Sequence, residues 1–399
     1  MAKQIQDAYI VAATRTPIGK APRGALKQTR PDDLLVHSIR ALLGKVPDLD
    51  TNLIEDLIVG CAFPEAEQGM NVARTSVLLA GLPNTVGGVT VNRFCASGLT
   101  ALAMAADRIR VGEADLMIAG GTESMSMVPT SGNTPSLNPN VFERDENVGI
   151  AYGMGITAEK VAEQWNVSRE DQDAFALSSH RKALAAQQRG DFKDEISPID
   201  VSVRSPDLKS GAVQVTTRTL TLDEGPRTDT SPEALAKLRP VFRDGGSVTA
   251  GNSSQRSDGA AALLVASERI LKQFNLTPLS RFVTFAVKGV PPEIMGIGPK
   301  EAIPLALKQA GLKTEDMGWI ELNEAFAAQS LAVVRDAGLN PEVVNPMGGA
   351  IALGHPLGAT GAIRSATVVH GLKRIQSKYG MVTMCVGTGM GAAGIIENL

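Results

Sequence analysis

Short apolar runs alternate with helical patterns along most of this chain. The runs of the first third, which predict buried strands, are residues 8–13, 57–59, 89–91 and 116–119. Between them lie segments with helical periodicity, each of which ends before a glycine, at residues 32–43, 72–80 and 99–111. Strands that alternate with helices in this way predict an α/β fold with the helices layered on a sheet.

The same pattern returns in the last third of the chain. An apolar run at 260–265 resumes the alternation, and a second at 282–287 opens a new series. A helix is predicted over 304–310. Strand-like segments then follow in the order of the first series, at residues 319–326, 344–345 and 381–387. The repeated order predicts two related α/β halves, although few residues are identical between them.

A segment without this alternation separates the two series. From Ser124 to Asn140 no period is visible, and helical patterns follow at 157–165 and 168–188. We therefore predict an inserted domain over 124–250. The N-terminal half would comprise residues 1–123 and 251–275, and the C-terminal half residues 276–399.

Composition limits the classes of function. The 39 basic and 42 acidic residues give a net charge of −3, which offers no electrostatic reason to expect nucleic acid. Three scattered cysteines suit neither a disulfide scaffold nor a zinc site, so no metal is predicted. The longest uncharged C-terminal stretch, Tyr379 to Ile396, is too short and too rich in glycine to span a membrane. The first residues lack a secretory or transit pattern, and the last three are not a peroxisomal signal, so we expect a cytoplasmic protein.

Two of the three cysteines lie where chemistry is plausible. Cys95 follows a predicted strand and precedes a predicted helix, where the helix dipole would favour a thiolate. Cys385 ends an apolar strand and precedes a glycine-rich turn whose backbone N–H groups could form an oxyanion hole. The alternatives are a small buried side chain for Cys95 and a packed glycine turn after Cys385. Cys61 lacks such a context and is interpreted as structural.

His355 and Asn323 are the other candidates. His355 is one of four histidines and lies in the stretch 345–356, among glycines and before Pro356. Its imidazole could act as an acid or base near neutral pH, or could simply serve a turn. Asn323 follows a strand and could orient a water or carbonyl, or cap a helix. Together, two thiols and one imidazole suit chemistry that makes and breaks thioesters.

Four motifs in order along the chain resemble those of the thiolase family. These are Cys95-Ala96-Ser97-Gly98, Asn323-Glu324-Ala325-Phe326, the histidine stretch 345–361 and Cys385-Val386-Gly387-Thr388-Gly389-Met390-Gly391. The resemblance covers essentially the whole chain. It implies a thiolase fold of two pseudo-symmetric βαβαβαββ halves, which form a five-layered α-β-α-β-α core with an inserted loop domain.

The resemblance also implies roles for these residues. Cys95 would be acylated, and His355 would take its proton. His355 and a water held by Asn323 would bind the thioester oxygen of the enolate, and Cys385 would exchange a proton with carbon. The backbone N–H groups of Cys95 and Gly387 would form a second oxyanion hole.

Coenzyme A would be a substrate, and no permanently bound cofactor is implied. Most of its site would lie in the inserted domain. Arg227 would lie against the adenine, Ser254 near the pantetheine, and Met154 in the acyl pocket.

Branch-specific features favour a degradative 3-ketoacyl-CoA thiolase. Thr388 and Gly153 differ from the glycine and histidine of biosynthetic acetoacetyl-CoA thiolases, and residues 251–255 are similar to the degradative branch. The alternatives are an acetyl-CoA acetyltransferase, a decarboxylating ketoacyl synthase, which the second thiol argues against, and an inactive subunit of a multienzyme complex. The family implies a homodimer or homotetramer, and a hydratase–dehydrogenase partner is conceivable.

Overall fold

Ten strands form one sheet, and two more form a separate hairpin, in the computed structural model, which describes residues 5–399. The strands are β1 (Tyr9–Arg15), β2 (Gly19–Lys20), β3 (Asp56–Gly60), β4 (Val89–Val91), β5 (Leu116–Ser124), β6 (Ile199–Pro206), β7 (Val213–Leu220), β8 (Ser257–Ala266), β9 (Ser280–Gly289), β10 (Met317–Leu322), β11 (Tyr379–Val386) and β12 (Met390–Asn398). The order across the main sheet is β10-β11-β12-β9-β1-β8-β5-β3-β4, with β2 beside β8.

Both halves of this sheet have the same topology. By order along the chain, the strands of the first half run 3-2-4-5-1 from β4 to β1, and those of the second run 3-2-4-5-1 toward β9. In the second half the third strand is reduced to one parallel bridge, between Ile320 and Val344. The halves meet where β1 and β9 pair antiparallel, Tyr9 with Arg281. The repeated order confirms the pseudo-symmetric halves predicted from the sequence.

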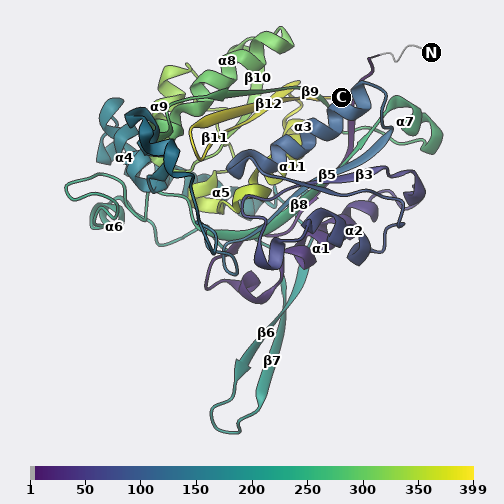
Figure 1. The fold of residues 1–399 in the computed structure, drawn as a ribbon, viewed down its shortest axis with the longest axis horizontal. Helices are drawn as coiled ribbons and strands as arrows, with labels where there is room; N and C mark the ends of the chain where they lie inside the picture. Colours follow the sequence, from purple (N-terminus) through teal and green to yellow (C-terminus); the bar gives the residue numbers. More distant parts are fainter. Residues whose placement is uncertain (1–4) are drawn as a thin grey trace.

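Helices cover the sheet on both sides and fill the space between its halves. They are α1 (Pro31–Leu43), α2 (Val72–Ala80), α3 (Ser97–Arg110), α4 (Met154–Gln164), α5 (Arg169–Arg189), α6 (Pro232–Ala236), α7 (Glu268–Phe274), α8 (Gly298–Ala310), α9 (Ala327–Asp336), α10 (Ala350–Leu353) and α11 (Leu357–Ile375). α1 and α2 pack on the first half, and α8 on the second. α3 and α11 pack on each other and on strands of both halves, which gives the five layers (Figure 1).

Separate apolar clusters hold these layers together. The central one contains Leu102 of α3 and Val369 of α11, while Ile39 of α1 and Ile303 of α8 belong to clusters on the outer faces. Residues 358–369 of α11 are all buried, so this helix has no solvent-exposed face over three turns. A helix that is covered on all sides lies inside a protein, which is the position of α11 in the middle layer.

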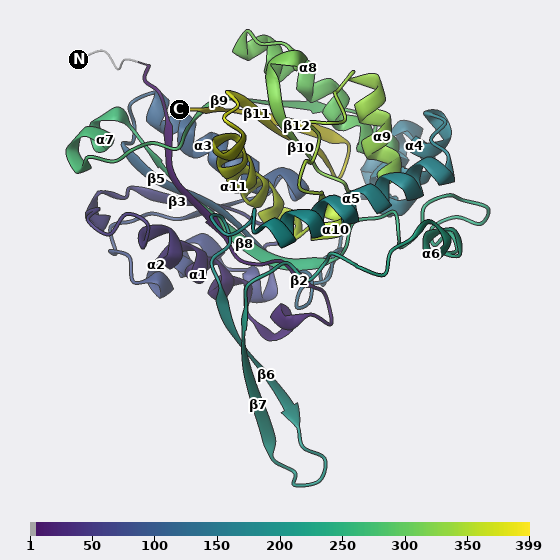
Figure 2. The ribbon, with the colours of Figure 1, turned by 180° about the vertical axis from the view of Figure 1, so that it is seen from behind.

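The segment between β5 and β8 carries α4, α5, α6 and the β6–β7 hairpin. Ser168 caps α5 by accepting a hydrogen bond from the Asp171 N–H at 3.1 Å, as the sequence predicted. The hairpin projects away from the body in both views (Figures 1 and 2). The domain boundaries proposed from the sequence stay a prediction.

One predicted helix was too short. The sequence pattern placed this helix over residues 304–310. In the structure α8 begins at Gly298, Pro299 occupies the first turn, and Pro304 lies inside the helix. Within residues 5–399, none of the helices is both long and apolar enough to cross a membrane.

Candidate active site

A sharp turn places Cys95 at the start of α3. Phe94, in the short 3-10 turn Phe94–Ala96, has φ +42°, a left-handed conformation that is uncommon for a side chain of this size. Ser97 holds the turn: its hydroxyl accepts from the Arg93 N–H at 2.9 Å and donates to the Phe94 carbonyl at 2.6 Å. The backbone therefore turns from β4 into α3 at the cysteine.

Cys385 approaches Cys95 from the other half of the molecule. It lies near the end of β11 and is completely buried. The Gly387 N–H, in the turn after β11, donates to the Cys95 sulfur, and the two thiols are close enough for the charge of one to affect the other. A Cβ atom on Gly387 would lie 3.6 Å from the Phe94 ring, so the two turns pack directly against each other.

Both thiols are protonated in the resting protein. Burial raises the pKa of Cys95 to about 12, and the Gly387 N–H acts only partly against it. Burial, and then the charge of Cys95, raise the pKa of Cys385 strongly as well. Loss of solvent therefore acts against the thiolate that the helix dipole was expected to favour. Cys95 therefore requires a base to become a nucleophile.

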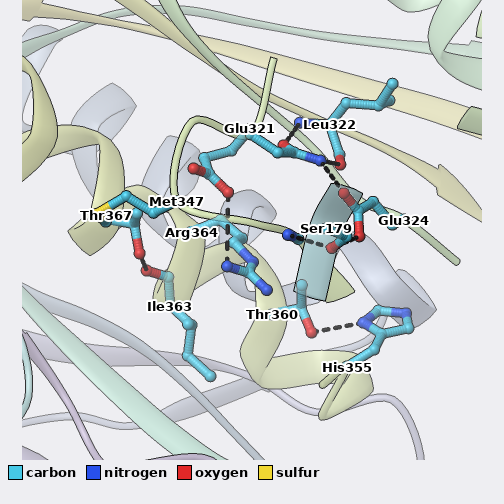
Figure 3. A network of polar contacts seen from close by, with 12 residues as sticks. Ser179, Glu321, Leu322, Glu324, Met347, His355, Thr360, Ile363, Arg364 and Thr367 are labelled. Atoms are coloured by element: carbon cyan, nitrogen blue, oxygen red, sulfur yellow. Dashed lines mark hydrogen bonds and ion pairs between the residues drawn. The ribbon is translucent and has the colours of Figure 1, made fainter. Parts of the chain in front are cut away.

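His355 and Asn323 form the second pair. The Nε2 atom of His355 lies 3.3 Å from Nδ2 of Asn323. Its Nδ1 atom lies 2.6 Å from the Thr360 hydroxyl (Figure 3). That hydroxyl is 3.2 Å from the Pro356 carbonyl, to which it donates. Thr360 therefore accepts from Nδ1–H, which leaves Nε2 as the bare, basic nitrogen.

The imidazole is neutral at physiological pH. Burial, and then the positive charge of Arg364, lower the pKa of His355 to about 3. Beside it, Oδ1 of Asn323 is buried and has no hydrogen-bond partner among the described residues. A buried carbonyl without a partner is costly, and this one is suited to accept from a water or ligand at the site.

Helix and strand packing joins the two pairs. The Asn323 N–H donates to the Thr383 carbonyl of β11, two residues before Cys385, at 2.9 Å. On the other side α11, which starts just after His355, packs on the turn that carries Cys95. These contacts link the segment of Asn323 to the strand of Cys385, and the helix that follows His355 to the turn of Cys95, so the sequence-predicted residues of the two halves lie on directly packed elements.

Two buried carboxylates hold the backbone around His355. Glu123 accepts from the N–H groups of Ala62 at 2.7 Å and Gly358 at 2.8 Å, so it ties the loop after β3 to the start of α11. Glu324 accepts from the Ser179 hydroxyl at 2.7 Å and the Ile351 N–H at 3.1 Å (Figure 3). Burial raises the pKa of both carboxyl groups, and these hydrogen bonds oppose it.

The three residues expected to bind coenzyme A lie at different places around the site. Arg227 lines a cavity of about 510 Å³. Ser254 lies between the lining residues Gly251 and Gln255 and donates its N–H to the Ala325 carbonyl at 2.9 Å. Met154 begins α4 and packs against the apolar cluster that contains Cys385.

One residue of the cavity wall contacts the histidine. Gln255, in its wall, accepts from the His355 N–H at 3.2 Å and donates through Nε2 to the Ile351 carbonyl at 2.9 Å. His180 also lines the cavity, and its Nδ1 accepts from the Arg227 N–H at 3.2 Å. Across residues 5–399, the His, Cys, Asp and Glu side chains form no group of three or more that could hold a metal ion.

Comparison with known proteins identifies the family. The thiolase N-terminal domain model matches residues 8–269, and the thiolase C-terminal domain model matches residues 276–398. This chain belongs to the thiolase family. It is 50% identical over 395 residues to the 3-ketoacyl-CoA thiolase of Bacillus subtilis (strain 168), an alignment that covers 98% of this chain and 100% of that protein.

Two solved thiolase structures are similar over nearly the full length. The Bacillus anthracis acetyl-CoA acetyltransferase has a TM-score of 0.88 at 38% identity, covering 100% of both chains. Human mitochondrial 3-ketoacyl-CoA thiolase has a TM-score of 0.87, also at 38% identity, covering 99% of both. These matches confirm the thiolase fold, which both enzymes share.

Several residues that shape this site received no role from the sequence. Thr360 and Glu324 lie inside the quoted thiolase motifs, so the signal was present but their partners were not visible. Glu123 is the charged residue of β5, whose nine residues are all buried, and a buried charge is itself unusual. His180 lies in a predicted helix that is rich in polar residues, and Arg364 lies beyond the quoted motifs, so neither stood out.

Proposed function

We propose that this thiolase is a 3-ketoacyl-CoA thiolase that cleaves a 3-ketoacyl-CoA with CoA to acetyl-CoA and a shortened acyl-CoA. The observation that carries the proposal is the approach of Cys95 and Cys385, with the Gly387 N–H on the first sulfur. The unprotonated Nε2 atom of His355 and the unpartnered Oδ1 atom of Asn323 are the other two groups that the reaction needs. The high identity to the Bacillus subtilis enzyme of that name supports it.

In the first half-reaction Cys95 attacks the ketone carbon, C3. Its proton passes to Nε2 of His355, and a bond forms between sulfur and C3. The bond between C2 and C3 then breaks, and its electrons go to the enolate of acetyl-CoA. Cys385 gives its proton to C2, which releases acetyl-CoA and leaves the acyl group on Cys95. This division of the work between two thiols fits their protonated resting state.

In the second half-reaction the thiol of free CoA attacks the acyl-Cys95 carbonyl. The CoA proton passes to Cys385, which was left as a thiolate, and His355 returns its proton to Cys95 as the new thioester leaves. Both thiols and the imidazole are then restored. Each step moves a proton between groups that the fold holds in a dry interior, where such transfers need no solvent reorganisation.

Two sets of donors would stabilise the oxyanions. The N–H groups of Gly387 and Cys95 both point at the Cys95 sulfur, next to which the oxygen of an acyl group would lie. The Nε2 atom of His355, once protonated, and a water held by Oδ1 of Asn323 would receive the thioester oxygen of the enolate. Preorganised donors of this kind contribute roughly 3–4 kcal/mol each.

The substrate would enter through the cavity that Arg227 lines. We propose that Arg227 and Ser254 contact the nucleotide and pantetheine parts of CoA, and that Met154 lines the acyl pocket beside Cys385. Lys20 and Arg256 also line the cavity and give it positive charge, which suits the phosphates of CoA. A homodimer or homotetramer, and a cytoplasmic location, stay predictions.

The deciding experiment is mass spectrometry of the intact protein after brief exposure to acyl-CoA without free CoA. We expect one acyl group per chain, on Cys95, and none in a Cys95→Ser variant. An adduct on Cys61 or Cys385 instead would overturn the roles. No adduct at all would favour the inactive subunit of a multienzyme complex.

The second candidate is an acetyl-CoA acetyltransferase, favoured by the similarity to the Bacillus anthracis enzyme of that name. Rates of thiolysis for C4 against C8 to C16 substrates separate the two. A 3-ketoacyl-CoA thiolase with broad tolerance cleaves the longer chains. Activity confined to C4 would refute our preference for the degradative branch.

A further inference from the structure

A buried ion pair lies directly behind the histidine. Arg364 of α11 is 2% exposed and Glu321 of β10 is 1% exposed, and the Nη1 atom of Arg364 lies 3.6 Å from Oε2 of Glu321 (Figure 3). The other carboxylate oxygen accepts from the indole N–H of Trp319 at 2.8 Å. Burying two charges costs several kcal/mol per ion, and only excellent geometry recovers this cost. At 3.6 Å the contact is loose, so stability alone does not explain it.

Both residues of this pair lie close in the chain to the groups of the site. Glu321 precedes Asn323 by two residues. Arg364 follows Thr360 by four residues, so the two side chains lie on the same face of α11. Thr360 holds Nδ1 of His355, and Nη2 of Arg364 reaches the carbonyl of Gly354 at 3.5 Å.

The Gly354 carbonyl belongs to the backbone that leads directly into His355. Gly354 has φ +102° and links the end of α10 to His355. This conformation is accessible to glycine and strained for other residues. The buried guanidinium of Arg364 adds a side-chain contact to this segment.

We propose that Glu321 and Arg364 form a positioning pair that sets the separation of His355 from Asn323. Glu321 extends from the strand that carries Asn323, and Arg364 from the helix that follows His355, so the pair spans the same two elements as the catalytic contact. Without it the 3.3 Å approach of Nε2 to Nδ2 would rest on the Thr360 hydroxyl and on contacts to the backbone of His355 and Asn323. This inference rests on the proposed function, in which His355 is the base.

The charges around the pair connect it to pH. Burial raises the pKa of Glu321 to about 7, against the effects of Arg364 and the indole of Trp319, and the negative charges of Glu195 and Glu324 raise it further. Near neutrality Glu321 therefore gains or loses its charge. When it is neutral, the charge of Arg364 acts on His355 without a counter-ion and makes the imidazole a weaker base.

The test compares Glu321→Gln, which keeps the shape of the side chain, with Arg364→Met, Arg364→Lys and the double variant Glu321→Gln/Arg364→Met. We expect kcat for thiolysis to fall about 10- to 100-fold in the first two, the size of effect that a displacement of about 1 Å produces. KM for both substrates should stay within about two-fold, because the cavity is untouched. Arg364→Lys should recover part of the rate, and the double variant should be no slower than the worse single variant.

Acylation of Cys95, followed by mass spectrometry against pH, gives an independent measurement. Wild-type acylation should slow as pH falls from 8 to 6, and Glu321→Gln should be slow at both values. Arg269→Met, which removes an exposed ion pair on α7, is the control for loss of an arginine. If Arg364→Met does not fold, the isosteric Glu321→Gln still decides the matter.

Three results would overturn the proposal. The first is a kcat within about two-fold of wild type in Glu321→Gln and Arg364→Met. The second is a double variant in which the two losses of kcat add. The third is a loss of kcat that accompanies a loss of thermal stability and that Arg364→Lys does not relieve. If the wild type itself forms no acyl-enzyme, the proposed function fails first. If the wild type is acylated normally and the variants match it, only the positioning pair is refuted.

Discussion

Arg15 offers a direct test of how the inserted segment is held on the core. Its guanidinium lies 2.7 Å from Oε1 of Glu195 and binds Asp223 through two contacts, at 2.7 and 2.9 Å, and all three side chains are almost completely buried. Arg15→Met keeps the apolar stem but leaves two buried carboxylates facing each other. Breaking a buried pair from one side costs about 3–5 kcal/mol, because the remaining charge has no partner.

The matched control is Arg269→Met. Arg269 makes a 2.7 Å contact with Asp115, as short as those of Arg15, but its side chain is 59% exposed. Such pairs contribute about 0–1 kcal/mol. Urea unfolding at pH 7, with midpoint and slope fitted for both variants, measures the difference in the free energy of unfolding. A loss in Arg15→Met as small as that of the control would refute the reasoning.

A functional effect should accompany the loss of stability. Asp223 lies four residues before Arg227, and its backbone carbonyl also accepts from Nε2 of Gln187 on α5 at 3.0 Å. When Asp223 loses its cation, the segment that lines the cavity is held less firmly. We expect KM for CoA to rise roughly ten-fold, equivalent to about 1.4 kcal/mol of binding, with a smaller change in kcat. Steady-state thiolysis with varied CoA measures both, and an unchanged KM would separate stability from binding.

Three further variants test single contacts. Thr360→Val removes the acceptor for Nδ1–H of His355 and should lower kcat about 10- to 100-fold. Thr360→Ser keeps the hydroxyl and is the control. If both variants had the same kcat, the tautomer assigned to His355 would be contradicted. Gly98→Ala would place a Cβ atom 2.6 Å from the Ala362 backbone nitrogen, where α3 crosses α11. It should lower the free energy of unfolding, measured in a thermal melt, by about 1–3 kcal/mol. An unchanged stability would contradict the close contact of the two helices. Burial, and then the charges of Arg227 and Lys20, lower the pKa of His180 to about 4. Between pH 6.5 and 4 the folded chain therefore does not take up the proton that the unfolded chain binds at this residue. Wild-type unfolding free energy should therefore fall more than that of His180→Asn between pH 6.5 and 4, and parallel curves would exclude this linkage.

Much of the fold was readable because its local signals agree. Apolar runs of three to six residues, helical segments ended by glycine, and their repeat in the same order predict two α/β halves. The strand order 3-2-4-5-1 in each half confirms this prediction. The start of β8 was less visible. The strand begins at Ser257 rather than Ala260, because the buried Asp258 is satisfied by the hydroxyls of Ser124 and Ser126, which lie far away in the sequence.

For the site, too, some properties follow from nearby sequence and others from residues far away in the chain. Motif residues such as Cys95 and His355 stand out because glycine, proline or a strand-to-helix boundary surrounds them. Their protonation could not be inferred, since it depends on how much protein covers them. Burial makes Cys95 a weaker acid than a free thiol and His355 a weaker base than a free imidazole, against the simple helix-dipole argument.

The contact between α3 and α11 explains why the two halves form one active site. α3 begins at the Cys95 turn and α11 begins after His355, and their first turns meet at Gly98 and Gly358, where backbones replace side chains. Glycine inside a helix lowers its stability by roughly 0.5–1 kcal/mol relative to alanine. Helix stability therefore does not explain the two glycines at this crossing, whereas the close approach of the helices does. In the proposed mechanism it sets how far the base that one half carries lies from the thiol that the other half carries. Because neither half by itself contains both groups, the proposed reaction depends on this helix crossing as much as on the catalytic side chains themselves.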